Sequence, residues 1–221
     1  RAALDWSYDL LEPTEQTLFR QLAVFAGGFT LSAVEAVCKD IAGSVLDNLT
    51  RLVDKSLVVA MGHRYYLLAT IRQYGLDKLW LAGEESDLRQ RHLTWSTQLA
   101  LRAAEQLLTN QQQTWLDELE TEHDNLRAAL RWALEGGELE TGIRLGSALW
   151  RFWGYRGYLL EGRTWLEQLL ARLAAQAEAV GPAQAQALAS MGVITTRLGD
   201  YDVADTVLQE GLRLYRGLGD K

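Results

Sequence analysis

Residues 45–79 contain two segments in which apolar residues recur at helical spacing, and a short β-prone hairpin lies between them. In the first stretch the apolar residues recur at i, i+1, i+4, i+7 and i+8, which puts them on one helix face. That face comprises Val45, Leu46, Leu49, Leu52 and Val53. Residues 57–59 are β-prone, Gly62 permits the positive φ of a tight turn, and residues 64–68 return as a second strand. Helical spacing then resumes, so the pattern predicts a helix, a two-strand hairpin and a second helix.

Three more helices are predicted before this segment. Residues 1–11, 13–26 and 31–38 carry apolar stripes at helical spacing, and Thr30 or Ser32 can cap the third of them. Helices followed by a two-strand wing and a further helix are the order of a winged helix-turn-helix domain. The helix just before the wing takes the position of the recognition helix.

The rest of the chain is predicted to be helical. A break at residues 83–86 precedes a long helix, and a second helix is expected to run unbroken from Thr114 to a stop at Gly136 and Gly137. Short polar or glycine turns separate four further helices, which we place at residues 138–153, 158–173, 183–198 and 201–217. We therefore predict a winged-helix domain over residues 1–83 and a helical repeat domain over residues 84–221.

An internal repeat refines the prediction for the second half. From Ala187 the chain runs ALASMGVITTRLGDYDVADTVLQEGLRLY, with small residues where two helices of a hairpin would touch and Tyr201 expected to plug the turn. This segment resembles a tetratricopeptide repeat, and a looser copy begins at Leu145. The fold class is thus mainly α, a winged helix followed by an α-α superhelical array. We expect the array to be truncated at its C-terminal side, where its end can support self-association.

Composition and charge exclude several classes of protein. A formal net charge of −7 has the wrong sign for non-specific attraction to phosphate backbones or anionic membranes. No apolar run approaches the roughly 18 residues needed to span a bilayer, and no signal segment opens the chain. The lone Cys38 fits a reducing compartment and is expected to be a buried, inert thiol. We expect a soluble, cytoplasmic chain.

Sequence motifs for catalysis are missing. The chain contains no GxxxxGK[ST] or GxGxxG phosphate loop and no GxSxG elbow, so it should not hydrolyse ATP by itself. His63, His92 and His123 lack HExxH spacing and have no cysteine pair nearby, which disfavours a metal site. We predict no catalytic, cofactor-binding or metal-binding residues, and His63 is expected at the tip of the wing.

An aromatic and basic cluster, WRFWGYRGY at residues 150–158, is the best candidate for a recognition surface. Trp150 and Trp153 share a helix face and are expected in the core. The remaining members, predicted to bind a partner, are Arg151, Tyr155, Arg156 and Tyr158. Packing within a helical hairpin is the alternative explanation for the same cluster.

The charges around the candidate recognition helix argue against DNA binding. Between Gly43 and Lys55 two acids balance two bases, and Asp47 lies in the stretch that would meet the base pairs. Because phosphate neutralisation supplies much of the affinity for DNA, a neutral helix favours packing against protein.

The blocks LDWSYDLLEPTEQTLFRQLAVFAGGFTL, LTRLVDKSLVV, YYLLATIRQYGLDKL and EHDNLRAALRWAL occur in this order along the chain. In this order they resemble the winged-helix and sensor-repeat region of bacterial signal-transduction ATPases with numerous domains (STAND), relatives of the maltose regulator and of NB-ARC proteins. The resemblance implies an upstream NTPase module that binds ATP or ADP, a winged helix that restrains this module, and repeats that bind an activating ligand or protein. Leu68 and Ala69 stand where plant and animal relatives have a nucleotide-contacting His-Asp pair, so this winged helix either does not sense nucleotide or uses other residues to do so.

Two functions follow from the sequence. The first is a non-enzymatic regulatory and sensor fragment whose winged helix packs on the upstream module and autoinhibits it. The alternative is a DNA-binding winged-helix transcriptional regulator with a tetratricopeptide-type sensor, for which a basic third helix or wing would be expected.

Overall fold

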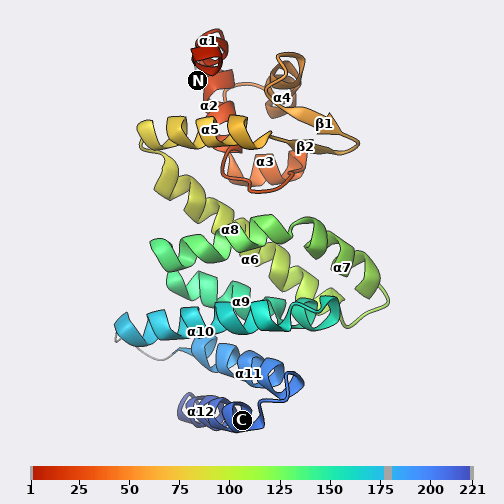
Figure 1. The fold of residues 1–221 in the computed structure, drawn as a ribbon, viewed down its shortest axis with the longest axis vertical. Helices are drawn as coiled ribbons and strands as arrows, with labels where there is room; N and C mark the ends of the chain where they lie inside the picture. The colour runs from red at the N-terminus through yellow and green to blue at the C-terminus, as the bar shows by residue number, and fades with distance from the viewer. Residues whose placement is uncertain (1, 177–180, 220–221) are drawn as a thin grey trace. The chain divides into compact units, whose positions relative to one another are not determined.

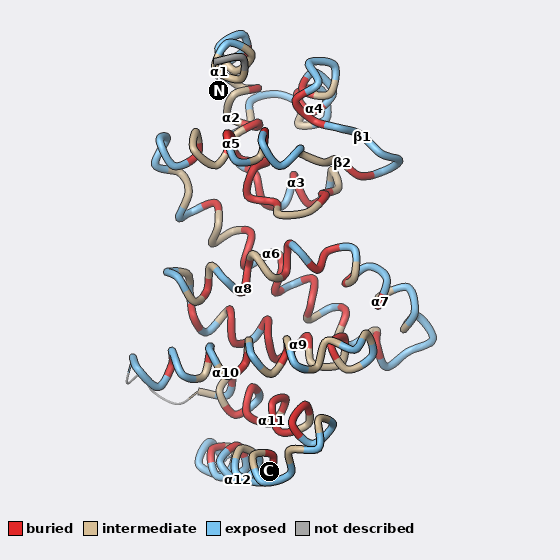
Figure 2. Tube along the Cα trace, viewed as in Figure 1, coloured by how far each residue is buried: buried red, intermediate tan, exposed pale blue. Residues whose placement is uncertain are grey.

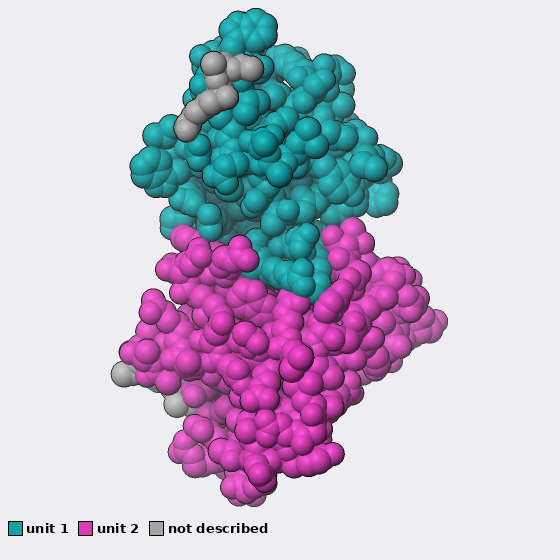
Figure 3. Space-filling view, in the orientation of Figure 1, with its two compact units in different colours: residues 1–95, 122–128 teal, residues 96–121, 129–221 magenta. Residues whose placement is uncertain are grey.

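The computed structural model describes residues 2–176 and 181–219. The chain splits into two compact units, one formed by residues 1–95 and 122–128 and the other by residues 96–121 and 129–221 (Figure 3). The predicted domain division at residue 83 stays a prediction, because compact units group contacts rather than independently folding segments.

The first unit is a winged helix-turn-helix (Figure 1). Its elements are α1 (Ala2–Asp9), α2 (Pro13–Leu22), α3 (Leu31–Val37), α4 (Val45–Asp54), β1 (Val59–Met61), β2 (Arg64–Tyr66) and α5 (Ala69–Leu81). The predicted order of helix, hairpin and helix is therefore confirmed. Leu46, expected on the buried face of α4, is instead exposed.

Local capping explains where these helices begin. Glu12 and Glu15 form a reciprocal capping box before α2, whose first residue is Pro13. The hydroxyl of Thr30 accepts a hydrogen bond from the backbone N–H of Ala33 at 3.2 Å, so Thr30 rather than Ser32 caps α3.

The wing is a short antiparallel pair in which Val59 faces Tyr66 and Met61 faces Arg64. Gly62 turns the chain with φ at +61°, as its position in the sequence predicts. A further antiparallel bridge joins β2 to the segment before α3, because Phe29 and Tyr65 exchange backbone hydrogen bonds of 2.9 and 2.8 Å.

One apolar core holds the first unit together (Figure 2). Its largest fully buried side chains include Phe19, Phe25, Phe29, Leu49, Leu52 and Leu79. Helices α2 and α5 approach closely at Gly75, where an added Cβ would lie 2.8 Å from the Cβ of Ala23. The spacing of apolar residues in the sequence thus specifies this core well.

The remaining helices are α6 (Glu85–Gln106), α7 (Gln112–Thr121), α8 (His123–Glu135), α9 (Leu139–Arg156), α10 (Leu159–Gln176), α11 (Pro182–Arg197) and α12 (Tyr201–Gly217). The division between the compact units falls within α6 and again around the first turns of α8. The prediction of one unbroken helix from Thr114 was wrong, because the chain leaves helical structure at Glu122 between α7 and α8. Glu122 is buried and pairs with Arg64, a constraint that apolar periodicity cannot reveal.

Small residues bring the helices of the second unit together. A Cβ on Gly142 of α9 would overlap the Cβ of Ala133 in α8, and one on Gly192 of α11 would overlap Leu208 of α12. The expectation that Tyr201 plugs a hairpin turn was wrong, since its side chain is 68% exposed at the start of α12. The turn is made by Gly199 instead, at φ +83°.

None of the helices in the described part of the chain is long and apolar enough to cross a bilayer.

Substituting Gly142→Ala tests the close approach of α8 and α9. Because the added methyl meets the Cβ of Ala133, which cannot rotate away, a helix must shift, and we expect destabilisation of about 1–3 kcal/mol. Urea unfolding followed by circular dichroism measures it. Gly217→Ala, in a helix with nothing near the added atom, is the control and should be neutral or stabilising by up to about 1 kcal/mol. Equal midpoints for both variants would contradict the tight contact.

Candidate functional site

The outward face of α4 and the wing is the candidate site, because helix-turn-helix domains that bind DNA use their second helix to contact the base edges. Ser44 caps α4 by accepting a hydrogen bond from the backbone N–H of Asp47 at 3.2 Å. Asn48, Leu49 and Leu52 face inward and fix the orientation of the helix. The exposed residues are Leu46, Asp47, Thr50, Arg51, Asp54 and Lys55. We call this set the α4 face.

The α4 face has no net charge. Its two acids, Asp47 and Asp54, balance its two bases, Arg51 and Lys55. Lys55 is also engaged, because its Nζ lies 2.6 Å from Oε2 of the buried Glu15. Burial raises the pKa of Glu15, whereas the hydrogen bond and positive charge of Lys55 lower it. The lowering effects are larger in sum, so the pKa of Glu15 lies below its ordinary value. The positive charge of Arg51 also lowers the pKa of Glu15, so both cations of the α4 face interact with this buried carboxylate.

The wing presents apolar side chains outward. Val59 and Met61 are exposed on β1, with Met61 64% exposed, and His63 lies at the tip as predicted. The wing segment 59–66 contains one Lys or Arg, Arg64, and its side chain is buried. Arg64 donates to Oε1 of Glu122 at 2.5 Å and to the carbonyl oxygen of Gly28 at 2.8 Å. The wing therefore offers no outward cation to a phosphate.

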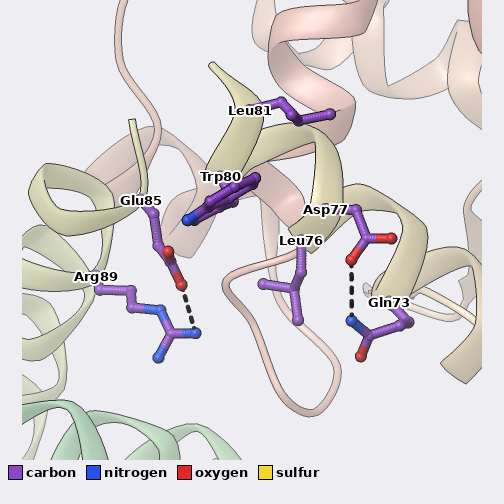
Figure 4. Close-up of a pocket in the computed structure, with 7 residues that line it drawn as sticks. All are labelled: Gln73, Leu76, Asp77, Trp80, Leu81, Glu85 and Arg89. Carbon is purple, nitrogen blue, oxygen red and sulfur yellow. Dashed lines mark hydrogen bonds and ion pairs between the residues drawn. The ribbon is translucent and has the colours of Figure 1, made fainter. Parts of the chain in front are cut away.

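An open hollow of about 550 Å³ lies beside the end of α5 and the start of α6 (Figure 4). Trp80, which is 67% exposed, stands between the Glu85–Arg89 ion pair of 2.8 Å and the Asp77–Gln73 hydrogen bond of 3.3 Å. Sequence reasoning missed this hollow, because the apolar spacing of α5 does not show which residue is left outside the core. Its groups include no arrangement of nucleophile and base.

The partner-binding residues predicted in the second unit lie at the end of α9 and just beyond it. Arg156 forms ion pairs with Asp117 and Glu120 of α7, and its hydrogen bond to Asp117 lowers the pKa of that carboxyl. Tyr158 donates to Oε1 of Glu120 at 2.6 Å. The structure thus places both side chains against α7, a contact that is neither a free recognition surface nor packing within a hairpin of neighbouring helices.

Two members of the predicted cluster lie elsewhere. The guanidinium carbon of Arg151 lies 4.3 Å from the ring centre of Trp150, an intramolecular cation–π contact. Tyr155 is the most exposed of the four. Partner binding through Arg151, Tyr155, Arg156 and Tyr158 stays a prediction.

Two of the histidines and the cysteine are buried in the protein interior. His92 is buried against Phe25 and Trp95, and His123 is also buried. Among the residues that the structure describes, no group of three His, Cys, Asp or Glu could hold a metal ion. Cys38 is buried as predicted, and burial raises the pKa of its thiol to about 12.

Comparison with known families assigns the first unit to a class of domain. Residues 11–79 match the family model described as a winged helix-turn-helix domain. The match covers the segment from just before α2 to near the end of α5, which contains the wing and the α4 face. The chain is thus a winged helix-turn-helix followed by a helical array.

Similar proteins occur in mycobacteria. A Mycobacterium tuberculosis protein provisionally named an HTH-type transcriptional regulator is 43% identical over 235 aligned residues, covering 100% of this chain and 26% of the relative. A Mycobacterium bovis protein of the same provisional name matches equally. A further M. tuberculosis protein, named only as uncharacterized, is 40% identical over 99 residues, covering 41% of this chain and 25% of the relative. The chain spans about a quarter of the length of these relatives.

Among solved structures, the chain is similar to the STAND protein with a tetratricopeptide repeat sensor from Pyrococcus horikoshii. The TM-score is 0.35 at 14% identity, over 97% of this chain and 46% of that one. A similarity of this size carries no argument about function.

His92 predicts a pH dependence of stability. Burial, with the positive charges of Arg72 and Arg89, lowers the pKa of His92 from 6.5 to about 3. As the pH falls below 6.5 the unfolded chain takes up a proton that the folded chain refuses, so the free energy of unfolding decreases. Below about pH 5.5 this one group should contribute a slope of about 1.4 kcal/mol per pH unit, lost only as the pH approaches 3.

Urea unfolding of wild type and His92→Gln between pH 4 and 7 measures this slope, and the variant should lack it. His63→Gln, the same substitution at the exposed wing tip, reports the effect of the substitution itself. Parallel stability curves for wild type and His92→Gln would show that the pKa of His92 is the same in the folded and the unfolded chain, which contradicts the prediction.

Proposed function

We propose that this chain is the winged-helix and helical-repeat region of a longer transcriptional regulator, and that its winged helix packs against protein instead of binding DNA directly. The observation that carries the proposal is that the α4 face and the tip of the wing together have no excess of positive charge. A winged helix that inserts α4 into the major groove needs cations around that helix, because phosphate contacts supply much of the affinity.

The cations that a DNA-binding winged helix would use are engaged elsewhere. Lys55 pairs with the buried Glu15, and Arg64 points inward to Glu122. Asp47 and Asp54 remain exposed and would repel phosphates. Electrostatics therefore opposes docking of the α4 face on a nucleic acid.

The same surface suits a protein partner. Leu46, Val59 and Met61 are exposed large apolar residues on α4 and β1. The centres of protein interfaces are apolar and poor in charge, and methionine is enriched there. The polar remainder of the α4 face would form the rim of such an interface.

The resemblance stated from the sequence suggests which protein packs there. In that account the partner is an upstream nucleotide-binding module of the same polypeptide, and ATP or ADP belongs to that module. Ligand or protein binding on the repeats would then favour an open state over the packed state. Such a shift requires the activator to bind the two states with different free energies.

Direct DNA binding is the second candidate, and the provisional name of the mycobacterial relatives favours it. Under this function Arg51 of the α4 face would have to contact DNA, together with cations from outside α4 and the wing.

Fluorescence anisotropy of labelled duplex DNA separates the two candidates. At near-physiological salt we expect no saturable binding of this chain up to about 100 μM, the weak end of ordinary non-specific affinity. The double variant Asp47→Lys with Asp54→Lys, which makes the α4 face basic, should gain binding that weakens with salt, and so shows that the assay detects phosphate contacts. A Kd below about 1 μM for wild type, lost in Arg51→Ala, would establish the DNA-binding candidate instead.

Hydrogen exchange tests the protein contact directly. In the longer protein, backbone amides of α4 and the wing should exchange more slowly than in the 221-residue chain, because a partner covers them. Introducing Leu46→Asp with Met61→Asp should remove this protection, since it places two charges in an apolar contact. Thr94→Asp, at an exposed site on α6, is the control. Equal exchange in the longer protein and the isolated chain would contradict the packing proposal.

A further inference from the structure

The short link into α8 sends two polar side chains into the interior of the first unit. Glu122, in the break between α7 and α8, is 1% exposed, and Asn125 in the first turn of α8 is fully buried. Both belong to residues 122–128, which form part of the first compact unit (Figure 3). Buried polar groups are costly unless every hydrogen-bonding atom finds a partner, so their surroundings are informative.

Asn125 uses all four of its hydrogen bonds. Its Oδ1 accepts from the backbone N–H groups of Ala26 and Gly27 at 2.9 and 3.3 Å. Its Nδ2 donates to the carbonyl oxygen of Gly28 at 2.9 Å and to Oε2 of Glu122 at 2.6 Å. Three of these bonds attach the amide to the turn between α2 and α3, the fourth goes to Glu122, and the buried His92 also interacts with this side chain.

Arg64 of β2 completes a closed ring. Its guanidinium donates to Oε1 of Glu122 at 2.5 Å and to the carbonyl oxygen of Gly28 at 2.8 Å. Glu122 therefore accepts one bond from Arg64 and one from Asn125, while the Gly28 carbonyl accepts from the same two side chains. We call Arg64, Glu122, Asn125 and the Gly28 carbonyl the polar ring.

The polar ring joins three segments that are far apart in the sequence. Gly28 lies in the turn before α3, Arg64 belongs to the wing, and Glu122 lies 58 residues beyond Arg64. The bridge between Phe29 and Tyr65 ties the first two segments together by backbone hydrogen bonds. From His123, α8 continues as one helix to Glu135.

Stability alone does not explain a buried ion pair at this position. Desolvating a guanidinium and a carboxylate offsets much of their attraction, and apolar residues of similar volume often serve as well or better. Removing one partner is nevertheless costly, because the other charge remains buried. The main effect of such a network is to specify which segments of the chain meet. Its contribution to the free energy of folding is small by comparison.

We propose that the polar ring is a conformational latch, which makes the position of the wing depend on the attachment of the link at Glu122 and the first turn of α8. When this link is seated, Arg64 is held inward and β2 stays paired with Phe29. When the link leaves, Arg64 loses its counter-charge and β2 loses its anchor. The latch would act in the same way whether the wing contacts protein or DNA, so the inference does not rest on the proposed function.

Two matched substitutions around this turn test the latch. Glu122→Gln supplies a single acceptor oxygen where the polar ring needs two, so either Arg64 or Asn125 loses its partner. Asp124→Asn makes the same chemical change two residues later, on a mostly exposed side chain that pairs only at the surface with Arg127. The readout is amide hydrogen exchange of the whole chain, resolved for Phe29 and Tyr65 and for helix α2.

In Glu122→Gln we expect the amides of Phe29 and Tyr65 to exchange at least about 10-fold faster than in wild type, with α2 unchanged. Asp124→Asn should leave all of them unchanged. Equal acceleration of α2, Phe29 and Tyr65 would mean an ordinary core contact, and unchanged exchange would mean that the wing is held without the ring. Either result overturns the latch.

If Glu122→Gln fails to fold, Arg64→Lys provides the second test. Lysine keeps the charge but lacks the planar fork that reaches Glu122 and Gly28 together. The same local acceleration at Phe29 and Tyr65, with α2 unaffected, is expected. Uniform acceleration, or none, again overturns the latch.

Discussion

The burial of Arg64 is the constraint on which much of the first unit depends. A guanidinium cannot lose its proton in a protein, so inside the domain it requires a carboxylate and further acceptors. Glu122 supplies the carboxylate and Gly28 supplies the carbonyl oxygen. Glu122 is also the residue at which the chain leaves helical structure between α7 and α8. The pair that anchors the wing thus coincides with the break between two helices.

The inward orientation of Arg64 also determines what the wing presents outside. With its only Lys or Arg buried, the wing is left with Val59, Met61 and His63 on its surface. Lys55, at the end of α4, likewise forms an ion pair with the buried Glu15, whose carboxylate neutralises its charge. Internal pairing, rather than composition alone, removes outward-facing cations from this winged helix and so disfavours phosphate contacts.

Sequence periodicity predicted the elements of the fold but not their polar contacts. The helix, hairpin and helix of residues 45–79 were predictable, because apolar spacing and Gly62 are local signals. The inward orientation of Arg64 was not, because its partner lies 58 residues away and a charged residue in a hairpin ordinarily faces solvent. The EHDN run at residues 122–125 was the one available signal, since polar residues interrupt an apolar stripe there. The same limit explains why the contacts of Arg156 and Tyr158 with α7 could not be predicted.

The shape of a winged helix does not fix its partner, and charge is the feature that distinguishes the two candidates. A helix and a hairpin that project together can enter a groove of DNA or lie against a protein, and only the first requires outward cations. The provisional name of the mycobacterial relatives and the neutral α4 face are compatible with each other. The chain spans about a quarter of each relative, so the name of the whole protein does not specify what this region contacts.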